Sequence, residues 1–228
     1  MSSIAIMQPT YIPWAGYFNL ISKVDYFVFL DDVKIEKQSW QVRNKIISDH
    51  QERYISLPVR GSRNQMIKEV QLNDSIPWRK KHTKLLEHTY AKHPLGKTCL
   101  LKVLPTINSN KITSLATLNI EIIKTISKEL GFNPIFHLSS QLNTVGERSK
   151  RLLSLCKELS CDHYFSPAGS KAYIEKDGDF SNSNISIEFQ NFTPPVYRQL
   201  NQPKFVPYLS IIDMVANIGW RETAGHIR

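Results

Sequence analysis

The sequence lacks any apolar run of the roughly 18 consecutive residues that a bilayer-spanning helix needs. Gln8 and Pro9 interrupt the first apolar stretch, and no basic region precedes it, so no secretory signal peptide is expected. Cysteine is scarce: Cys99, Cys156 and Cys161 are the 3 cysteines, and they form no CxxC or Cys/His metal pattern. Their odd number argues against a disulfide framework, so the sequence predicts a cytoplasmic protein in a reducing compartment.

Motifs of common hydrolases are also missing. The 7 histidines form no HExxH motif, and no serine lies in a G-x-S-x-G elbow. Zinc hydrolysis and esterase chemistry are therefore unsupported, and we predict no metal site. Repeats and low-complexity runs are absent too. With 228 residues, of which 41% are apolar, the chain is expected to form a single domain over residues 1–228, with a C-terminal subdomain at about 180–228 as an option.

Positive charge is what the chain has in excess. Lys and Arg number 29 against 20 Asp and Glu, which gives a net charge of +9. Such an excess favours an anionic partner, whether a nucleic acid, a phosphorylated small molecule or a membrane surface. No RNP-type aromatic motif, zinc finger or long basic tract occurs, so no nucleic-acid partner is expected. A local anion site in a cleft and a solvated basic surface remain the two interpretations.

The opening of the chain is its most informative part. Residues 4–7 and 26–30 are apolar runs typical of buried parallel strands, and residues 16–24 have the pattern of a helix between them. In parallel α/β units ligands bind at the carboxyl ends of the strands. Gln8 follows the first strand, and Asp31 and Asp32 follow the second. We therefore expect these three side chains at the same edge of the sheet.

The rest of the chain continues this alternation of strands and helices. Further strands are predicted at 54–59, 68–72, 134–138, 164–165 and 185–189, and helices at 76–92, 112–130, 147–159 and 210–218. Residues 32–45 are expected to form a functional loop or short helix, and Gly131 and Gly219 to end the helices that precede them. The pattern predicts an α/β fold with a mostly parallel, Rossmann-like sheet flanked by helices and a small C-terminal α+β extension.

Asp31 and Asp32 form the first of several polar clusters that can carry chemistry. Adjacent carboxylates at a strand end can bind a metal, accept a hydrogen bond from a ribose or amine, or act as a base. The structural alternative is that one carboxylate caps the next turn while the other is solvated. In the second cluster, Trp40 can stack on a base or sugar and Arg43 can bind a phosphate or carboxylate. A buried tryptophan beside a surface arginine is the alternative there.

Two later clusters resemble anion sites. Ser139 and Ser140 follow a predicted strand, and basic residues including Lys150 and Arg151 come near the next helix start, a combination typical of an anion cradle. A solvated basic helix face is the alternative. The segment 166–171, followed by Tyr173, is a small-residue loop that allows close backbone approach to a ligand, but its spacing is not that of a Walker A motif. A last group, Tyr197, Gln199 and Asp213, is best explained as a structural hydrogen-bond network.

Taken in order, several segments carry a family resemblance over nearly the whole chain. They are MQPTYIPWAGYFNLI, DYFVFLDDV, SWQVRN, SLPV, ERSKRLLSLC, DHYFSPAGSKAY and the terminal YRQ…F…LSIIDMVANIG. Together they resemble the WbqC-like family of bacterial surface-polysaccharide loci. The resemblance implies a role in the biosynthesis of O-antigen or a related glycan.

A second resemblance is to nucleotidylyltransferase-type (HUP) folds, which also begin with a strand, a Pro-containing loop and a small motif opening a helix. Those proteins place H-x-G-H on ATP phosphates, whereas this chain has Trp14-Ala15-Gly16-Tyr17. Gly16 matches and both histidines are missing. Without an imidazolium to stabilise developing phosphate charge, ordinary nucleotidyl transfer is disfavoured. Aromatic rings at these places suit stacking on a base or sugar better.

The resemblances imply a transferase or amide-forming ligase that acts on a nucleotide-linked amino sugar by acyl or aminoacyl (for example glycyl) transfer. In that role Asp31 or Asp32 accepts a proton from the amine or orients it. The implied reaction is compatible with ATP as a cosubstrate, and the protein is compatible with a homo-oligomeric assembly. Two alternatives stay open: a glycosyltransferase, although a D-x-D spacing is missing, and a non-catalytic nucleotide-sugar-binding protein. The residues expected to bind substrate are Gln8, Tyr11, Trp14, Tyr17, Trp40, Arg43, Asn44, Ser139, Ser140, Lys150, Arg151, Ser166, Gly169, Lys171 and Tyr173.

Overall fold

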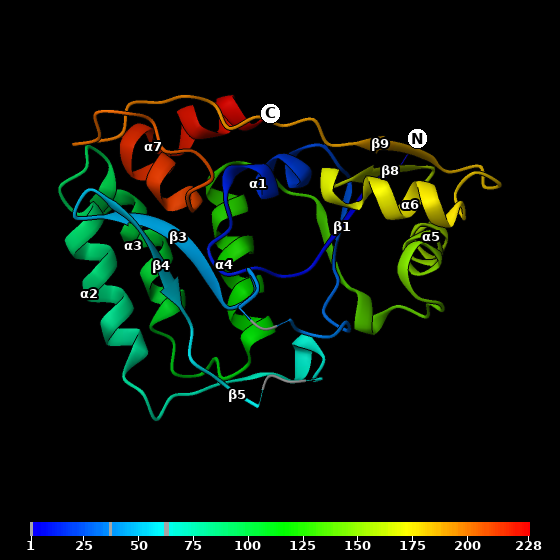
Figure 1. Cartoon of the computed structure of the whole chain (residues 1–228), viewed down its shortest axis with the longest axis horizontal. Helices are drawn as coiled ribbons and strands as arrows, with labels where there is room; N and C mark the ends of the chain where they lie inside the picture. The colour runs from blue at the N-terminus through cyan, green and yellow to red at the C-terminus, as the bar shows by residue number, and fades with distance from the viewer. Residues whose placement is uncertain (1, 37, 62–63) are drawn as a thin grey trace.

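A parallel sheet of five strands is the centre of the computed structural model, which describes residues 2–36, 38–61 and 64–228 (Figure 1). Its strand order is β7-β2-β1-β8-β9, and every neighbouring pair is parallel. The strands are β1 (Ser3–Met7), β2 (Tyr26–Phe29), β7 (Ile135–Leu138), β8 (His163–Ser166) and β9 (Ser186–Phe189). The predicted Rossmann-like α/β fold is therefore confirmed.

Side chains of the strands alternate between two hydrophobic cores, one on each face of the sheet. Ala5 and Phe27 belong to the larger core, which includes α1 (Ala15–Ser22), α4 (Leu115–Glu129) and α7 (Ile211–Ile227). Ile4 and Val28 belong to the smaller core with α5 (Arg148–Glu158) and α6 (Lys171–Asp177). Figure 1 shows these two groups of helices on opposite sides of β1. Both faces are covered, which explains why β1 and β2 are apolar runs rather than alternating ones.

An insertion between β2 and α4 carries the remaining helices and strands. They are β3 (Arg43–Ser48), β4 (Gln51–Ser56), β5 (Val59–Arg60), η1 (Ile67–Glu69), β6 (Gln71–Leu72), α2 (Trp78–Tyr90) and α3 (Gly96–Ile107). The sequence patterns missed β3, because its hairpin turns at Asp49 and His50, both with positive φ, without the Asn-Gly or Asp-Gly pair typical of such turns. They also missed α3, which starts at a glycine and contains Pro105. The strand expected at 54–59 is the end of β4 and the start of β5.

The helix ends follow local sequence with one exception. Ser114 caps α4, since its Oγ accepts a hydrogen bond from the Thr117 backbone N–H at 3.4 Å, and Gly131 follows the helix in the left-handed region. Gly219 was expected to end the last helix. It interrupts α7 with φ +82°, but the helix resumes and runs to Ile227, because its second half still buries apolar surface.

The last 49 residues share the sheet and core of the rest of the chain: β9 is a strand of the main sheet and α7 packs in the larger core. All three cysteines are buried free thiols, and burial raises the pKa of Cys156 to about 12 and that of Cys161 to about 11. Within the described ranges, none of the helices has the length and apolar character needed to cross a membrane.

Candidate functional site

The strand order defines a switch point between β1 and β8. After β1 the chain enters α1, in the larger core, whereas after β8 it enters a short 3-10 turn, η3 (Ala168–Ser170), and then α6 on the other face. Loops that leave neighbouring parallel strands toward opposite faces open a crevice, and α/β proteins bind ligands there. The two loops concerned, residues 8–14 and 166–171, are called the switch-point loops below. Both contain residues that the sequence singled out.

A group of polar side chains that we call the aspartate cluster lies beside the switch point. Its members are Asp31, Asp32, Ser139, Ser140 and Arg151. Asp31 is 3% exposed, and Ser140 donates to its carboxylate twice, from the backbone N–H at 3.0 Å and from Oγ at 2.7 Å. Ser139 Oγ lies 3.1 Å from Asp31 Oδ1 and 2.5 Å from Asp32 Oδ1. A hydroxyl has one hydrogen, so Ser139 donates to one of the two carboxylates at a time. The sequence placed Asp31 and Asp32 with Gln8 at this sheet edge, whereas the partners of the two aspartates here are the serines that follow β7.

An ion pair closes the cluster from the smaller-core side of the sheet. Arg151 of α5 binds Asp32 through Nη2, and its Nη1 donates to the Thr144 carbonyl oxygen at 2.7 Å. The side chains of Arg151 and Asp32 are only 19% and 17% exposed. Both serines and Arg151 are thus engaged by the aspartates, so they can hold a phosphate only if these contacts open. Lys150, next to Arg151, is exposed.

Three residues expected to contact substrate are instead buried around the first switch-point loop. Tyr11 is 0% and Tyr17 2% exposed; Tyr11 OH pairs with His82 Nδ1 at 2.9 Å, and Tyr17 OH donates to the Gln8 carbonyl at 3.1 Å. Asn44 is also buried and donates to the backbone carbonyls of this loop, at Tyr11 and Ile12. These side chains fix the conformation of the loop and leave no face open to a ligand.

The structure adds two polar residues that the sequence patterns missed. Gln41 Nε2 donates to Gln8 Oε1, while Gln41 Oε1 is buried and has no hydrogen-bond partner in the described part of the chain. Asn119 of α4, 0% exposed, donates to the backbone carbonyls of Pro9 and Gln41. Its position on the apolar face of the helix predicted at 112–130 was the available signal, since a polar residue there must find buried partners.

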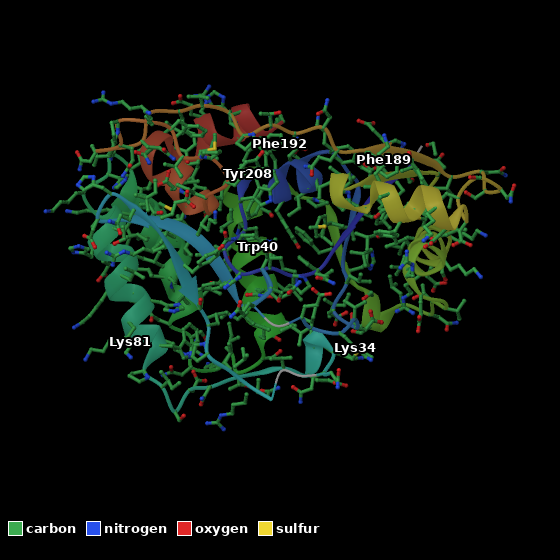
Figure 2. The ribbon with its side chains drawn as sticks, viewed as in Figure 1. Lys34, Trp40, Lys81, Phe189, Phe192 and Tyr208 are labelled. Carbon is green, nitrogen blue, oxygen red and sulfur yellow. The ribbon has the colours of Figure 1, made fainter. Side chains whose placement is uncertain are left out.

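Trp14 precedes α1 and packs against an aromatic pair from the C-terminal segment. Its ring centroid is 5.7 Å from that of Phe192 and 5.3 Å from that of Tyr208, both of which Figure 2 labels near the start of α1. The indole also lies over Gly16: a Cβ there would come within 2.2 Å of ring atoms of Trp14. The glycine shared with the H-x-G-H motif is therefore explained here by packing against Trp14.

Replacing Gly16 with alanine is expected to lower the free energy of unfolding by about 1–3 kcal/mol, because the added methyl overpacks against the indole. Chemical denaturation would measure this. Gly169→Ala is the matched control, since a Cβ at Gly169 meets nothing within 4 Å and little change is expected. A Trp14→Leu background should relieve most of the Gly16→Ala loss; an undiminished loss there would contradict the explanation.

Trp40 stands at the exposed end of the same region. It is 50% exposed, and its backbone carbonyl accepts a hydrogen bond from Tyr11 N at 3.0 Å, which joins the insertion to the first switch-point loop. Its ring lies 6.3 Å from the equally exposed Tyr54, over which the Arg43 guanidinium stacks at 4.3 Å. Trp40 near the middle of the molecule (Figure 2) thus belongs to an aromatic and cationic platform. Of the two interpretations of Trp40, the buried tryptophan is therefore excluded.

Side-chain hydrogen bonds hold the second switch-point loop in place. Ser166 is buried and its Oγ bonds Ser170 Oγ at 2.7 Å, which fixes the turn into α6. Gly169 and Lys171 are exposed; Lys171 Nζ lies 3.8 Å from Glu175 and 5.7 Å from the Phe189 ring. Tyr173 is partly buried, and burial raises the pKa of its hydroxyl. Lys171 is thus the accessible cation of this loop.

The predicted hydrogen-bond network of Tyr197, Gln199 and Asp213 is present. Asp213 Oδ2 accepts from Tyr197 OH at 2.7 Å and from Gln199 Nε2 at 3.0 Å, and burial raises the pKa of this carboxyl. Asp213 also borders a cavity of about 190 Å³, whose other polar lining residues include His50, His88, Lys92 and His93. In the described ranges no group of three or more His, Cys, Asp or Glu side chains is placed to hold a metal ion.

Comparison with known proteins decides the family. The model of the WbqC-like protein family matches residues 8–224. The chain belongs to the WbqC-like family. A Mycobacterium tuberculosis protein named "Uncharacterized protein Rv1507c" is 30% identical over 223 residues, which cover 96% of this chain and 95% of that protein. No solved structure matches the chain, so the likeness to nucleotidylyltransferase-type folds stays a prediction.

The WbqC-like segments of the sequence converge in the fold. Residues 7–21 form the first switch-point loop and α1, residues 39–44 lie against that loop, and residues 162–173 form β8 and the second loop. The segment from Arg148 onward supplies the arginine of the aspartate cluster. Segments far apart in the sequence therefore meet along one edge of the sheet.

Proposed function

We propose that this WbqC-like protein is a transferase or amide-forming ligase that modifies a nucleotide-linked amino sugar by acyl or aminoacyl (for example glycyl) transfer, in surface-polysaccharide biosynthesis. The observation that carries the proposal is the switch point between β1 and β8. Its loops present an exposed cation, Lys171, and adjoin the aromatic platform of Trp40 and Tyr54. Stacking surfaces and a cation at such a crevice suit a nucleotide with its phosphates.

The ion pair between Asp32 and Arg151 supplies the chemistry in this proposal. A ligand that carries one amine and one anionic group can replace the contact between the carboxylate and the guanidinium. The amine then binds Asp32, and a phosphate or carboxylate binds Arg151 bidentately. Exchange costs little when the ligand restores both charge pairings. Asp31, whose oxygens Ser139 and Ser140 hold, positions this pair rather than contacting substrate.

Transfer follows from that arrangement. The amine nitrogen forms a bond to the carbonyl carbon of an activated acyl donor, and the donor's leaving group departs with the electron pair of the broken bond. Asp32 accepts the proton that the nitrogen loses. Gln41 Oε1 is buried beside Gln8 and has no hydrogen-bond partner among the described residues, so it can accept from the substrate only once binding opens the first switch-point loop.

The test is incubation of the purified protein with nucleotide-linked amino sugars, ATP and amino acids, followed by mass spectrometry. A mass gain on the sugar is expected. Asp32→Asn and Arg151→Gln should each reduce turnover about 100-fold or more. The control is Arg148→Gln on the same helix, which removes a side chain that is 61% exposed and pairs with Asp177, and it should change turnover by less than about 3-fold. Unchanged turnover in both cluster variants, with folding intact, would refute the assigned roles.

One observation favours a second candidate, a non-catalytic nucleotide-sugar-binding protein. Hydrogen bonds and the ion pair occupy the oxygens of both carboxylates, so no base is free before a ligand binds. In that case calorimetry should detect binding of the nucleotide sugar while no cosubstrate gives a product. The same Arg151→Gln variant would then weaken binding, which separates this candidate from a failed assay.

A further inference from the structure

Most of the protein's net charge lies in one part of the insertion. Residues 76–111 contain 8 Lys and Arg and a single acid, Glu87, so they hold a net charge of +7 out of the +9 of the whole chain. This segment is α2, α3 and their flanking turns, which Figure 1 shows at the flank of the molecule remote from α5 and α6. The rest of the chain is close to neutral. The charge excess is therefore a local feature of this helical hairpin.

The lysines of the hairpin are exposed and mostly have no acidic partner. Lys81, labelled on α2 in Figure 2, is followed by Lys84 and His88 at i+3 and i+7, so these three project from one face of the helix. Lys102 pairs with Glu129 at 3.0 Å. The exposed lysines for which no ion pair occurs in the described part of the chain are Lys80, Lys81, Lys84, Lys92, Lys97 and Lys111. We call these six the hairpin lysines.

The single arginine of this segment has a structural role. Arg79 is 9% exposed and donates to the carbonyl oxygens of Ile107 at 2.7 Å and Ile112 at 2.6 Å, besides pairing with Asp74. The two aromatic rings other than histidine, Trp78 and Tyr90, are buried as well. The surface thus offers point charges without guanidinium forks or stacking rings, which are the groups that nucleic-acid sites use.

Some apolar side chains of the same segment are exposed as well. Leu101 of α3 is 73% exposed, and Ile76 and Leu95 are each 40% exposed. Lys97 precedes Leu101 by four residues on α3, so these two side chains share a face of the helix. Lysines and exposed aliphatic side chains on one hairpin match the interface of an anionic bilayer, where the charges attract the headgroups and the aliphatic groups enter the boundary region.

From these observations we propose that the α2–α3 hairpin docks the protein on an anionic membrane surface. The partner is a bilayer with acidic headgroups, bound through the hairpin lysines with Leu101 as an apolar contact. The proposal does not depend on the proposed function, because the hairpin is separate from the switch point. Each lysine close to such a surface raises affinity about five-fold, so several together produce measurable binding.

Vesicle co-sedimentation of the full chain tests the proposal. The probes are vesicles of phosphatidylcholine alone and of phosphatidylcholine with about one-third phosphatidylglycerol. Binding to the acidic vesicles, weakening steeply with salt, and no binding to the neutral vesicles are expected. Replacing Lys80, Lys81, Lys84 and Lys97 together with glutamine should weaken binding by about 100-fold or more.

Two matched controls distinguish binding through the hairpin from attraction by the overall positive charge of the protein. Glutamine at Lys23, Lys128, Lys157 and Lys176, four exposed lysines outside the hairpin, removes the same charge and should weaken binding less than about five-fold. Leu101→Ser should weaken binding about five-fold, whereas Val196→Ser, at a position 75% exposed elsewhere, should leave it unchanged.

Several outcomes would overturn the proposal. They are absence of vesicle binding at low salt, equal loss in the two quadruple variants, and equal binding to neutral vesicles. A duplex or single-stranded oligonucleotide that binds at lower protein concentration than the acidic vesicles, with the same loss in the hairpin variant, would assign the surface to nucleic acid instead.

Discussion

Replacement of Asp31 by alanine is expected to lower the free energy of unfolding by about 4 kcal/mol. The carboxylate is 3% exposed and receives two hydrogen bonds from Ser140, with Ser139 Oγ 3.1 Å away. Alanine removes all of these contacts and leaves the Ser140 N–H and Oγ without the carboxylate acceptor, while Ser139 Oγ keeps only Asp32. Hydrogen bonds to a charged acceptor contribute about 1.5–3 kcal/mol each, but they are not additive here because they share one group. Urea denaturation with an unchanged slope would measure the loss.

Asp31→Asn and Asp32→Ala are the controls for this prediction. Asparagine keeps the shape and one acceptor oxygen, so a smaller loss of about 1–2 kcal/mol is expected. Asp32 is more exposed, with 17% of its side chain accessible, so its removal should also cost less than that of Asp31. If Asp31→Ala costs under about 1 kcal/mol, the cluster does not join the ends of β2 and β7 in the way described.

The second large effect is a loss of stability in mild acid caused by His82. This side chain is 7% exposed, pairs with Tyr11 OH at 2.9 Å, and has Nε2 3.1 Å from the Ser56 carbonyl oxygen. Burial lowers its pKa from 6.5 to about 4. The unfolded chain therefore binds a proton near pH 6.5 that the folded chain does not bind until about pH 4. The free energy of unfolding therefore decreases as the pH is lowered through this window, by about 3 kcal/mol in total.

Unfolding free energies measured from pH 7 to pH 4 for the natural chain and for His82→Gln test this assignment. Glutamine can keep the polar contacts but does not titrate, so the difference between the two curves should shrink as the pH falls. The other titrating groups are common to both chains and cancel. Parallel curves over the whole range would show that His82 does not cause the acid sensitivity.

Local sequence was sufficient to predict the sheet. Two of its five strands, β1 and β2, follow from apolar runs of four or more residues, and β9 follows from alternation at 185–189. The amphipathic patterns at 112–130 and 147–159 became α4 and α5 with ends shifted by a few residues. These signals are local because burial on both faces leaves a continuous apolar run, and burial on one helix face leaves a period near 3.6. Elements without such patterns, β3 and α3, were missed, since their turn and proline do not carry a typical local signal.

The candidate site was predicted in part. Strand ends identified Asp31 and Asp32 as one polar cluster, and Ser139 and Ser140 with Arg151 as a separate one, since the carboxyl ends of parallel strands carry ligand-binding residues. The sequence could not indicate that the serines and Arg151 would bind the aspartates themselves, because those partners are more than 100 residues apart along the chain. Tyr11 and Tyr17 could not be assigned from the sequence either. An aromatic residue in a loop motif can line a pocket or fill a core, and only tertiary packing decides between the two.

The sequence by itself determined the α/β class, the parallel sheet, the family and the sheet edge that carries the polar clusters. These depend on residue type and short-range periodicity, which are visible along the chain. Tertiary structure alone decided which charges are free: it paired Asp32 with Arg151, buried Arg79 and left the hairpin lysines exposed. The physical reason is that pairing and burial are set by distances between side chains far apart in sequence, and those distances exist only once the chain has folded.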